Sequence, residues 1–320
     1  MMLKSKLITG LVGLTLLGSS SAFAAIQTTP TNSKATYAKT KYPIVFNHGM
    51  FGFTRLGVPE FGLDYFYQVL PDLASNGATV YATQVSPLNS TEVRGEQLVK
   101  QVEEVLAITG AKKVNLIGHS HGGPTTRYAA GVMPSKIASV TTVAGVNKGS
   151  KVADLLLSTG VGAQVVSAFV EATLVPVMNW AQGKPNLPTD MNASLKSLST
   201  EGSLAFNKRF PNGIPTTECG QGTAVTNGIY NYSWTGNKTV TNVLDPDTIV
   251  VGLAGLAFGF TDNDGLVGTC SAHFGKVIRD DYAHNHLDEV NQILGLRGLF
   301  CPDPVELYRQ HANRLKLAGL

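Results

Sequence analysis

The chain has 320 residues, of which 43% are hydrophobic and 15% charged, and its formal net charge is +3. The first 24 residues hold two of the 25 basic residues and none of the 22 acidic ones, so the remainder carries a net charge of about +1. This near balance argues against nucleic acid as a partner, because proteins that bind nucleic acid usually carry a clear basic surplus.

The N-terminal segment has the pattern of a signal peptide. Two lysines precede an apolar stretch at residues 7–17, and Ala22-Phe23-Ala24 fits an A-x-A cleavage site. The apolar stretch is shorter than the roughly 20 residues of a membrane-spanning helix. We therefore predict that residues 1–24 are removed on export through the periplasm to the outside of the cell. Residues 25–320 would then form a single α/β domain.

Strand-like and helix-like segments alternate after the signal peptide. Short runs typical of β-strands occur at residues 42–46, 78–82, 114–117 and 137–144. Apolar residues recur at helical spacing over residues 92–108, and a second helix is expected after Ser120. This alternation predicts a mostly parallel central sheet that is covered by helices on both faces.

The sequence Gly-His-Ser-His-Gly-Gly at residues 118–123 lies between a strand-like run and a helix-like segment. A tight turn of this kind exposes the serine hydroxyl and crowds positions 118 and 122, where only glycine fits. It also places the backbone N–H of His121 at the start of a helix, where a developing oxyanion can be held. The pattern therefore predicts that Ser120 is a nucleophile. A dinucleotide-binding loop is disfavoured, because Ser120 stands where G-x-G-x-x-G requires glycine.

Two apolar segments, residues 152–157 and 163–178, are predicted to be helices inserted after the fourth strand-like run. They are either ordinary buried helices or a mobile cover whose apolar face meets lipid, and the sequence leaves both interpretations open. We refer to residues 150–180, approximately, as the predicted lid.

A nucleophilic serine requires a histidine as base and an acid that orients this histidine. In the chain order serine, acid, histidine, the candidate bases are His273, His284, His286 and His311. His286 is favoured, because it lies in a polar loop ahead of a predicted helix at residues 290–296, whereas His311 is expected to be solvated. The acid is Asp262 or Asp264, which share one turn and which the pattern does not separate.

Six stretches of the chain together resemble the secreted bacterial triacylglycerol lipases of the foldase-dependent, calcium-containing type, which have the α/β-hydrolase fold. They are residues 42–50, 92–98, 113–124, 263–270, 285–292 and 307–315. The resemblance covers nearly all of the exported chain and is weakest in the predicted lid. It implies a catalytic triad of Ser120, Asp264 and His286, with an oxyanion hole formed by the backbone N–H groups of Met50 and His121.

The same resemblance implies one structural calcium ion. Asp245 and Asp288 match its two carboxylate ligands, and Gln292 and Leu296 match positions that provide backbone carbonyls. Hard oxygen ligands of this kind suit Ca²⁺. Because Asp288 lies two residues from His286, the ion would fix the loop that holds the base. Without the resemblance, Asp245 would be interpreted as part of a simple turn.

The chain has three cysteines, and export makes a disulfide possible. Three cysteines allow one bridge and leave one thiol, and their positions alone do not identify the pair. The resemblance pairs Cys219 with Cys270 and gives Cys301 no counterpart.

The activity that the resemblance implies is hydrolysis of triacylglycerols to fatty acids at an oil–water interface, by a secreted enzyme that we expect to be a monomer. Its implied partners are the lipid substrate, a dedicated foldase chaperone and the secretion machinery. The nearest alternative is a soluble carboxylesterase of the same fold. A lipid-binding protein without catalysis is a further alternative, which the presence of all three triad candidates disfavours.

Overall fold

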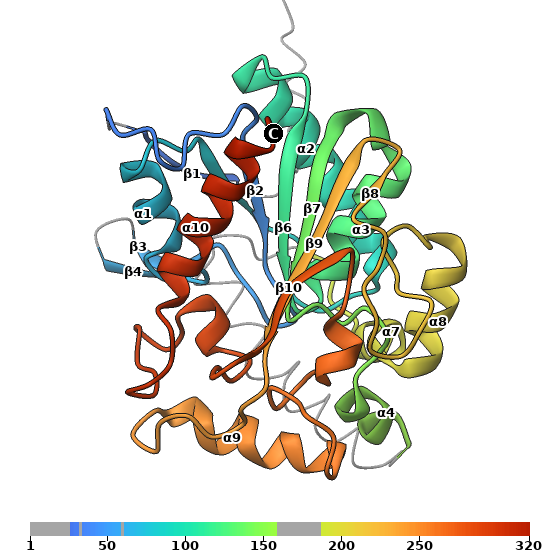
Figure 1. Ribbon diagram of the computed structural model, residues 1–320. Helices are drawn as coiled ribbons and strands as arrows, with labels where there is room; N and C mark the ends of the chain where they lie inside the picture. The colour runs from blue at the N-terminus through green and yellow to red at the C-terminus, as the bar shows by residue number, and fades with distance from the viewer. Residues whose placement is uncertain (1–25, 32–33, 59–60, 159–186) are drawn as a thin grey trace, which may run out of the picture.

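The computed structural model describes residues 26–31, 34–58, 61–158 and 187–320 (Figure 1). The predicted signal peptide and the predicted helix at residues 163–178 lie outside this part of the chain. In the described ranges, no helix has the length and apolar character needed to cross a membrane.

An eight-stranded sheet forms the centre of the described fold. In spatial order its strands are β1 (Ile26–Thr29), β5 (Val80–Thr83), β2 (Ile44–Asn47), β6 (Val114–His119), β7 (Ile137–Val143), β9 (Ile229–Gly236) and β10 (Lys276–Tyr282), with β8 (Val225–Thr226) paired to β9. The path from β5 to β10 is parallel throughout, whereas β1 and β8 run antiparallel to their neighbours. The prediction of a mostly parallel sheet is confirmed.

Helices cover both faces of the sheet (Figure 1). The α-helices are α1 (Val69–Ser75), α2 (Thr91–Thr109), α3 (Gly122–Val132), α4 (Lys151–Ser158), α7 (Met191–Leu198), α8 (Thr200–Arg209), α9 (Pro246–Gly255) and α10 (Pro304–Leu317). Helices α1 and α10 pack on the side to which Phe46 points, and α2 and α3 pack on the other side against Val45. Adjacent residues of a strand point to opposite faces, so β2 is buried on both sides.

Shorter elements connect these layers. They are the antiparallel pair β3 (Arg55–Val58) and β4 (Phe61–Asp64) and the 3₁₀ turns η1 (Pro134–Lys136), η3 (Leu256–Phe258), η4 (Thr269–Ala272) and η5 (Asp288–Val290). The first predicted lid helix, at residues 152–157, corresponds to α4. It is apolar, but of its residues only Ala153 is fully buried.

The sequence of α2 explains where this helix begins and ends. The hydroxyl of Ser90 accepts a hydrogen bond from the backbone N–H of Val93 at 3.3 Å and so caps the first turn. Gly110 adopts the left-handed conformation that ends the helix, and its N–H donates to the carbonyl of Leu106 at 2.9 Å. Between these caps, apolar residues such as Leu98 are buried against the sheet. The predicted helix is confirmed.

The carboxyl ends of β2, β6 and β7 lie together at one edge of the sheet. A Cβ on Gly122, just after β6, would lie 2.3 Å from the backbone oxygen of Asn47 in β2. A Cβ on Gly123 would lie 2.9 Å from the Cα of Gly145, just after β7. Helices α4 and α9 lie at this end of the molecule (Figure 1). In parallel α/β sheets, functional residues gather at this edge.

The predicted helix at residues 290–296 is wrong. The chain forms only the single turn η5 and then a series of irregular turns. The side-chain amide of Gln292 donates hydrogen bonds to the backbone oxygens of Asp64 and Tyr65, at 2.6 and 3.0 Å. These polar contacts with a distant segment decide the backbone path, and they outweigh the apolar spacing on which the prediction was based.

The expectation that His311 is solvated is also wrong. His311 is fully buried on the face of α10 that also carries Tyr308 and Leu315, three and four residues away. Its Nε2 lies 2.8 Å from the hydroxyl of Thr141 in β7, and its ring packs against Trp234. The histidine is therefore a hydrogen-bonded part of the core, and its Nδ1 also lies 2.9 Å from the guanidinium of its neighbour in sequence, Arg314.

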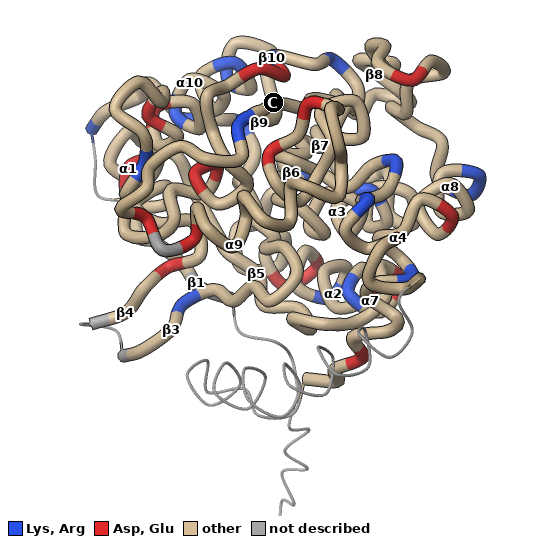
Figure 2. Tube along the Cα trace, turned by 90° about the horizontal axis from the view of Figure 1, so that it is seen from below, with Lys and Arg blue, Asp and Glu red and all other residues tan. Residues whose placement is uncertain are grey.

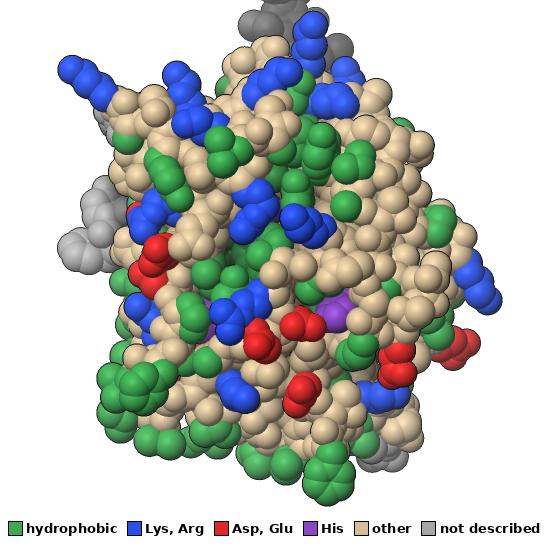
Figure 3. All heavy atoms as spheres, viewed as in Figure 1, with side chains coloured by type: hydrophobic (Ala, Val, Ile, Leu, Met, Phe, Trp, Pro, Cys, Tyr) green, Lys and Arg blue, Asp and Glu red, His purple; other side chains and the backbone are tan. Residues whose placement is uncertain are grey.

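The surface of the described chain separates charge from apolar area. Acidic and basic residues are interspersed around the outside (Figure 2), in keeping with the near balance of charge. Apolar side chains gather at the end of the molecule that α9 occupies (Figure 3). The α9 apolar surface, as we call it, consists of residues that are more than half exposed: Val243, Leu244, Ile249, Val250, Leu253, Leu256, Phe260, Leu299 and Phe300.

Candidate active site

Ser120 lies in a tight turn between β6 and α3. Its φ of 57° falls in the left-handed region, a strain that persists in a non-glycine residue only where the surroundings fix it. A Cβ on Gly118 would lie 2.1 Å from the backbone oxygen of Gly122, and a Cβ on Gly122 would lie 2.3 Å from that of Asn47. The requirement for glycine at both positions is confirmed.

The loop after β2 passes directly beside this serine. A Cβ on Gly49 would lie 2.7 Å from the Cβ of Ser120, so a larger residue does not fit there. The backbone N–H of Met50 and that of His121, at the start of α3, have no hydrogen-bond acceptor in the described part of the chain. The imidazole of His121 is buried and contacts the hydroxyl of Thr91 at 2.9 Å. Two unpaired amides next to a serine are what an oxyanion hole requires.

Asp264 and His286 form a buried pair. The Nδ1 of His286 lies 2.8 Å from Oδ2 of Asp264, and both side chains are almost completely buried. The other carboxylate oxygen of Asp264 accepts hydrogen bonds from the N–H groups of Leu266 and Val267 at 2.9 and 2.8 Å. Asp262, the alternative acid, is exposed. The ring of His286 packs against that of His119, the residue before the serine, with 4.6 Å between centroids.

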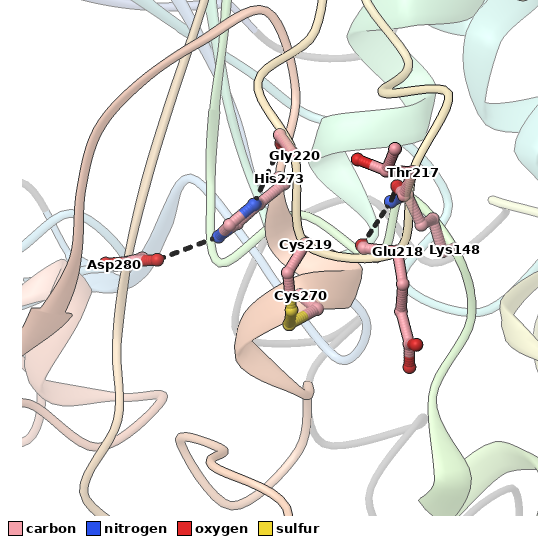
Figure 4. The surroundings of a disulfide bond; sticks show 8 residues. All are labelled: Lys148, Thr217, Glu218, Cys219, Gly220, Cys270, His273 and Asp280. Atoms are coloured by element: carbon pink, nitrogen blue, oxygen red, sulfur yellow. Dashed lines mark hydrogen bonds and ion pairs between the residues drawn. A yellow bond between two sulfur atoms is a disulfide. The ribbon is translucent and has the colours of Figure 1, made fainter.

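The other candidate bases have different partners. His273 lies 3.0 Å from the carboxylate of Asp280 and 3.1 Å from the carbonyl of Gly220 (Figure 4). His284 contacts the carbonyl of Pro302 at 2.7 Å, and burial lowers its pKa to about 4. Together with the buried position of His311 described above, these contacts leave His286 as the histidine that is paired with an acid beside the serine.

Sequence reasoning missed Arg94. Its guanidinium is completely buried and donates hydrogen bonds to the carbonyls of Ser86, of His48 at 2.6 Å and of Gly49 at 3.3 Å. Burial lowers its pKa to about 9. The arginine therefore fastens the loop that runs beside the serine. One signal was available, because Arg94 lies one helical turn before Leu98 on the apolar face of α2, where a charge is unexpected.

Asp245 and Asp288 are buried near each other, at the start of α9 and in η5. A third carboxylate, Asp247, is buried beside them and accepts a hydrogen bond from the side-chain amide of Asn285 at 3.1 Å. Burial, and then the charge of Asp245, raise the pKa of Asp247 to about 7. Burial is also the main cause that raises the pKa of Asp288 to about 6. Sequence reasoning did not include Asp247.

These carboxylates fit a hard cation. Within the described ranges, one oxygen each of Asp245, Asp247 and Asp288 is buried without a hydrogen-bond partner. The same ranges contain no group of three or more acidic, histidine or cysteine side chains arranged to hold a metal ion. Backbone carbonyls would therefore have to complete a ligand set, and Gln292 and Leu296 follow Asp288 in the same irregular loop.

The disulfide joins Cys219 to Cys270, as the resemblance implies. Figure 4 shows that hydrogen bonds also hold the backbone around the disulfide. The ammonium group of Lys148 donates to the carbonyls of Thr217 and Glu218 at 2.8 and 2.6 Å. Cys301 is a free thiol that donates to the carbonyl of Ala283 at 2.5 Å.

Comparison with known proteins shows the family to which the chain belongs. The family model described as "alpha/beta hydrolase fold" matches residues 42–289. A triacylglycerol lipase of Vibrio cholerae is 55% identical over 291 residues, which cover 90% of this chain and 92% of that protein. Triacylglycerol lipases of Burkholderia plantarii and Pseudomonas fragi are 38% and 40% identical, covering 98% and 88% of this chain and 94% and 98% of those proteins.

Solved structures agree on the fold. The mature form of the Bacillus licheniformis lipase BlEst2 superimposes with a TM-score of 0.57 over 84% of this chain and 93% of that chain, at 19% identity. At this low identity the likeness concerns the fold, whereas the sequence relatives place the chain more narrowly. The chain belongs to the α/β-hydrolase family and, within it, to the triacylglycerol lipases.

Proposed function

We propose that the protein is a secreted lipase that hydrolyses triacylglycerols through an acyl-enzyme formed on Ser120. The observation that carries the proposal is the buried pair of Asp264 and His286 packed beside the turn that presents this serine. The pair supplies an oriented base, and the turn supplies an exposed hydroxyl.

In the proposed reaction, Nε2 of His286 takes the proton of Ser120 as its oxygen attacks the acyl carbonyl. Asp264 accepts the hydrogen bond of Nδ1–H, which selects the correct tautomer and stabilises the imidazolium that forms. The N–H groups of Met50 and His121 hold the oxyanion, and each such donor is worth about 3 kcal/mol. The imidazolium then protonates the leaving alcohol. Water, activated by the same base, releases the fatty acid and restores the serine.

The proposal includes one structural calcium ion, held by the carboxylates of Asp245 and Asp288 and by the carbonyls of Gln292 and Leu296. A divalent cation there would neutralise buried carboxylates and fix the loop that carries His286. The buried, unpartnered carboxylate oxygens support this assignment. The residues of this chain would still perform every proton transfer.

The α9 apolar surface supports a lipid substrate. It lies at the same end of the molecule as the turn of Ser120, and a Cβ on Gly265, next to Asp264, would lie 2.1 Å from the side chain of Val251 in α9. An apolar surface next to the catalytic groups suits an enzyme that works against an oil–water interface. The opening of the predicted lid, the dedicated foldase, the secretion machinery and the monomeric state also belong to this proposal.

The test compares Ser120→Ala with Ser139→Ala, a matched replacement of a buried serine that bonds Asn115 within the sheet. Hydrolysis of a long-chain triacylglycerol emulsion should disappear in the first variant and persist in the second. Turnover that survives in Ser120→Ala would remove this serine from its role. If both the wild type and Ser120→Ala bind lipid and neither hydrolyses it, the non-catalytic alternative would be favoured.

A second measurement separates the lipase from a carboxylesterase of the same fold. The rate is followed as a short-chain ester is raised through its solubility limit, and long-chain emulsions are compared with soluble esters. A lipase gains activity when the emulsion forms. A carboxylesterase saturates below the solubility limit and leaves the long-chain emulsion unhydrolysed. Expression with and without a candidate foldase tests the chaperone requirement with the same assay.

A further inference from the structure

We propose that Tyr65 and His119 are positioning residues that tie the backbone of the base to the loop beside the serine. The N–H of Gly49 donates to the hydroxyl of Tyr65 at 3.1 Å. This hydroxyl lies 2.7 Å from Nδ1 of His119, and Nε2 of His119 lies 3.0 Å from the carbonyl of His286. The contacts form one continuous chain between two parts of the site that are far apart in sequence.

The direction of every hydrogen bond in this chain follows from one fixed acceptor. The carbonyl of His286 can only accept, so Nε2 of His119 must carry the proton. In the neutral imidazole Nδ1 is then the acceptor, and the hydroxyl of Tyr65 must donate to it. The oxygen of Tyr65 is left to accept from the N–H of Gly49. All four groups are satisfied in this arrangement, and the opposite tautomer would set Nε2 against the carbonyl oxygen.

Burial keeps these hydrogen bonds in place and His119 in the neutral form. Both Tyr65 and His119 lie in the core, and the aromatic ring of Tyr65 is held edge-on by Phe53 and Phe66, with centroids 5.6 and 5.1 Å away. Burial, and then the neighbouring His286, hold the pKa of His119 well below its ordinary value. A neutral His119 adds no charge next to a base that itself becomes cationic during the reaction.

The chain completes the fixation of His286. The N–H of this residue donates to the carbonyl of Asp264 at 2.9 Å, and its Nδ1 is held by the carboxylate of the same aspartate. With the carbonyl held by His119, only Nε2 of the base is left for the serine and the leaving group. At its other end the series of hydrogen bonds holds the N–H of Gly49, the residue before Met50. The base and the proposed oxyanion donor are therefore held in position by the same hydrogen bonds, and small errors in such alignment lower the rate by large factors.

The inference rests on the proposed hydrolytic function, and the test keeps the two apart. The variant Tyr65→Phe deletes one hydroxyl and keeps the ring. Tyr308→Phe is the matched control, because Tyr308 is also buried in the same aromatic cluster but its hydroxyl has no hydrogen-bond partner in the described part of the chain. His119→Leu removes both hydrogen bonds of the imidazole, and His119→Gln restores an N–H near the carbonyl of His286.

Each variant is measured for kcat and KM with a soluble ester, for its thermal midpoint and for labelling of Ser120 by a fluorophosphonate. We expect Tyr65→Phe and His119→Leu to lower kcat about tenfold or more with little change in KM, and His119→Gln to recover a large part of the loss. Tyr308→Phe should stay within about twofold of the wild type. The low-field proton signal of Nδ1–H in His286 should shift in Tyr65→Phe and not in Tyr308→Phe.

Equal kcat values for Tyr65→Phe and Tyr308→Phe, both folded, would overturn the inference. So would a loss of kcat in His119→Leu that His119→Gln does not relieve at all, because a purely structural histidine behaves in that way. If the wild type neither reacts with the fluorophosphonate nor hydrolyses the ester, the proposed function fails instead. Labelling of Ser120 in every variant, with kcat unchanged, contradicts only the positioning role.

Discussion

Removal of the disulfide between Cys219 and Cys270 should lower stability strongly and leave catalysis largely intact. The bridge closes a loop across a sequence separation of 51 residues. Closing a loop of this length removes about 14 cal/mol/K of chain entropy from the unfolded state, which corresponds to about 4 kcal/mol at 25 °C. The double variant Cys219→Ser/Cys270→Ser should therefore lose about 4 kcal/mol of unfolding free energy.

Local contacts explain why activity should survive. The segment around Cys219 is also held by Lys148 and by His273, and neither contact involves sulfur (Figure 4). The turn that contains Asp264 is closed by its own hydrogen bonds, including that from the N–H of Thr269 to the carbonyl of Asp262 at 2.9 Å. We therefore expect kcat at 25 °C to stay within about twofold of the wild type, since the alignment of the acid does not depend on the bridge.

The assay is equilibrium unfolding in urea, followed by tryptophan fluorescence, together with hydrolysis of a soluble ester. Cys301→Ser is the matched control, because it removes a thiol that closes no loop, and it should cost less than about 1 kcal/mol. A loss below about 1 kcal/mol in the double variant would refute the loop-closure argument. A tenfold fall in kcat in a folded double variant would show that the bridge positions Asp264.

Three further predictions concern the acid, the buried arginine and the carboxylate cluster. Asp264→Asn should lower kcat about 10⁴-fold in the ester assay, because the wrong tautomer of the base is then favoured; the exposed Asp262→Asn is its control, and an equal loss in both would contradict the assignment. Arg94→Met should lower the free energy of unfolding in urea by about 3 kcal/mol, because it leaves buried carbonyls without a hydrogen-bond donor. A loss below about 1 kcal/mol would contradict this reasoning. The pKa values of Asp247 and Asp288 are raised to about 7 and about 6, so without calcium the folded state binds more protons than the unfolded state between these values and the ordinary value. In the presence of a chelator, the thermal midpoint should therefore fall as the pH rises from about 4 to about 7, and added calcium should reverse the fall. A midpoint that calcium leaves unchanged would argue against the ion.

The fold could be predicted from the sequence because its signals are local. Buried parallel strands appear as short apolar runs, and α2 carries its own start and stop signals in Ser90 and Gly110. The turn of Ser120 was predictable for the same reason, since the crowding that requires glycine lies within one short segment. The choice between Asp262 and Asp264 was not local, because it depends on which carboxylate is buried against His286.

The errors have a common physical cause. The backbone around Gln292 is set by hydrogen bonds to Asp64 and Tyr65, which no window of neighbouring residues contains. The burial of His311 could not be predicted because its partners, Thr141 and Trp234, lie in strands far away in sequence. Tyr65 and His119 were likewise invisible as a pair, because a hydrogen-bond chain of this kind exists only after the sheet has formed.

The hydrogen bonds that connect the parts of the site also bear on how the protein folds. The contact between His119 and the carbonyl of His286 spans 167 residues, and that between Gln292 and Asp64 spans 228. Contacts of such sequence separation form late, because the intervening chain must first be ordered. A half-folded chain therefore contains Ser120 before His286, the proposed base, is held in place. A chain in which these long-range contacts have not formed should therefore lack hydrolytic activity.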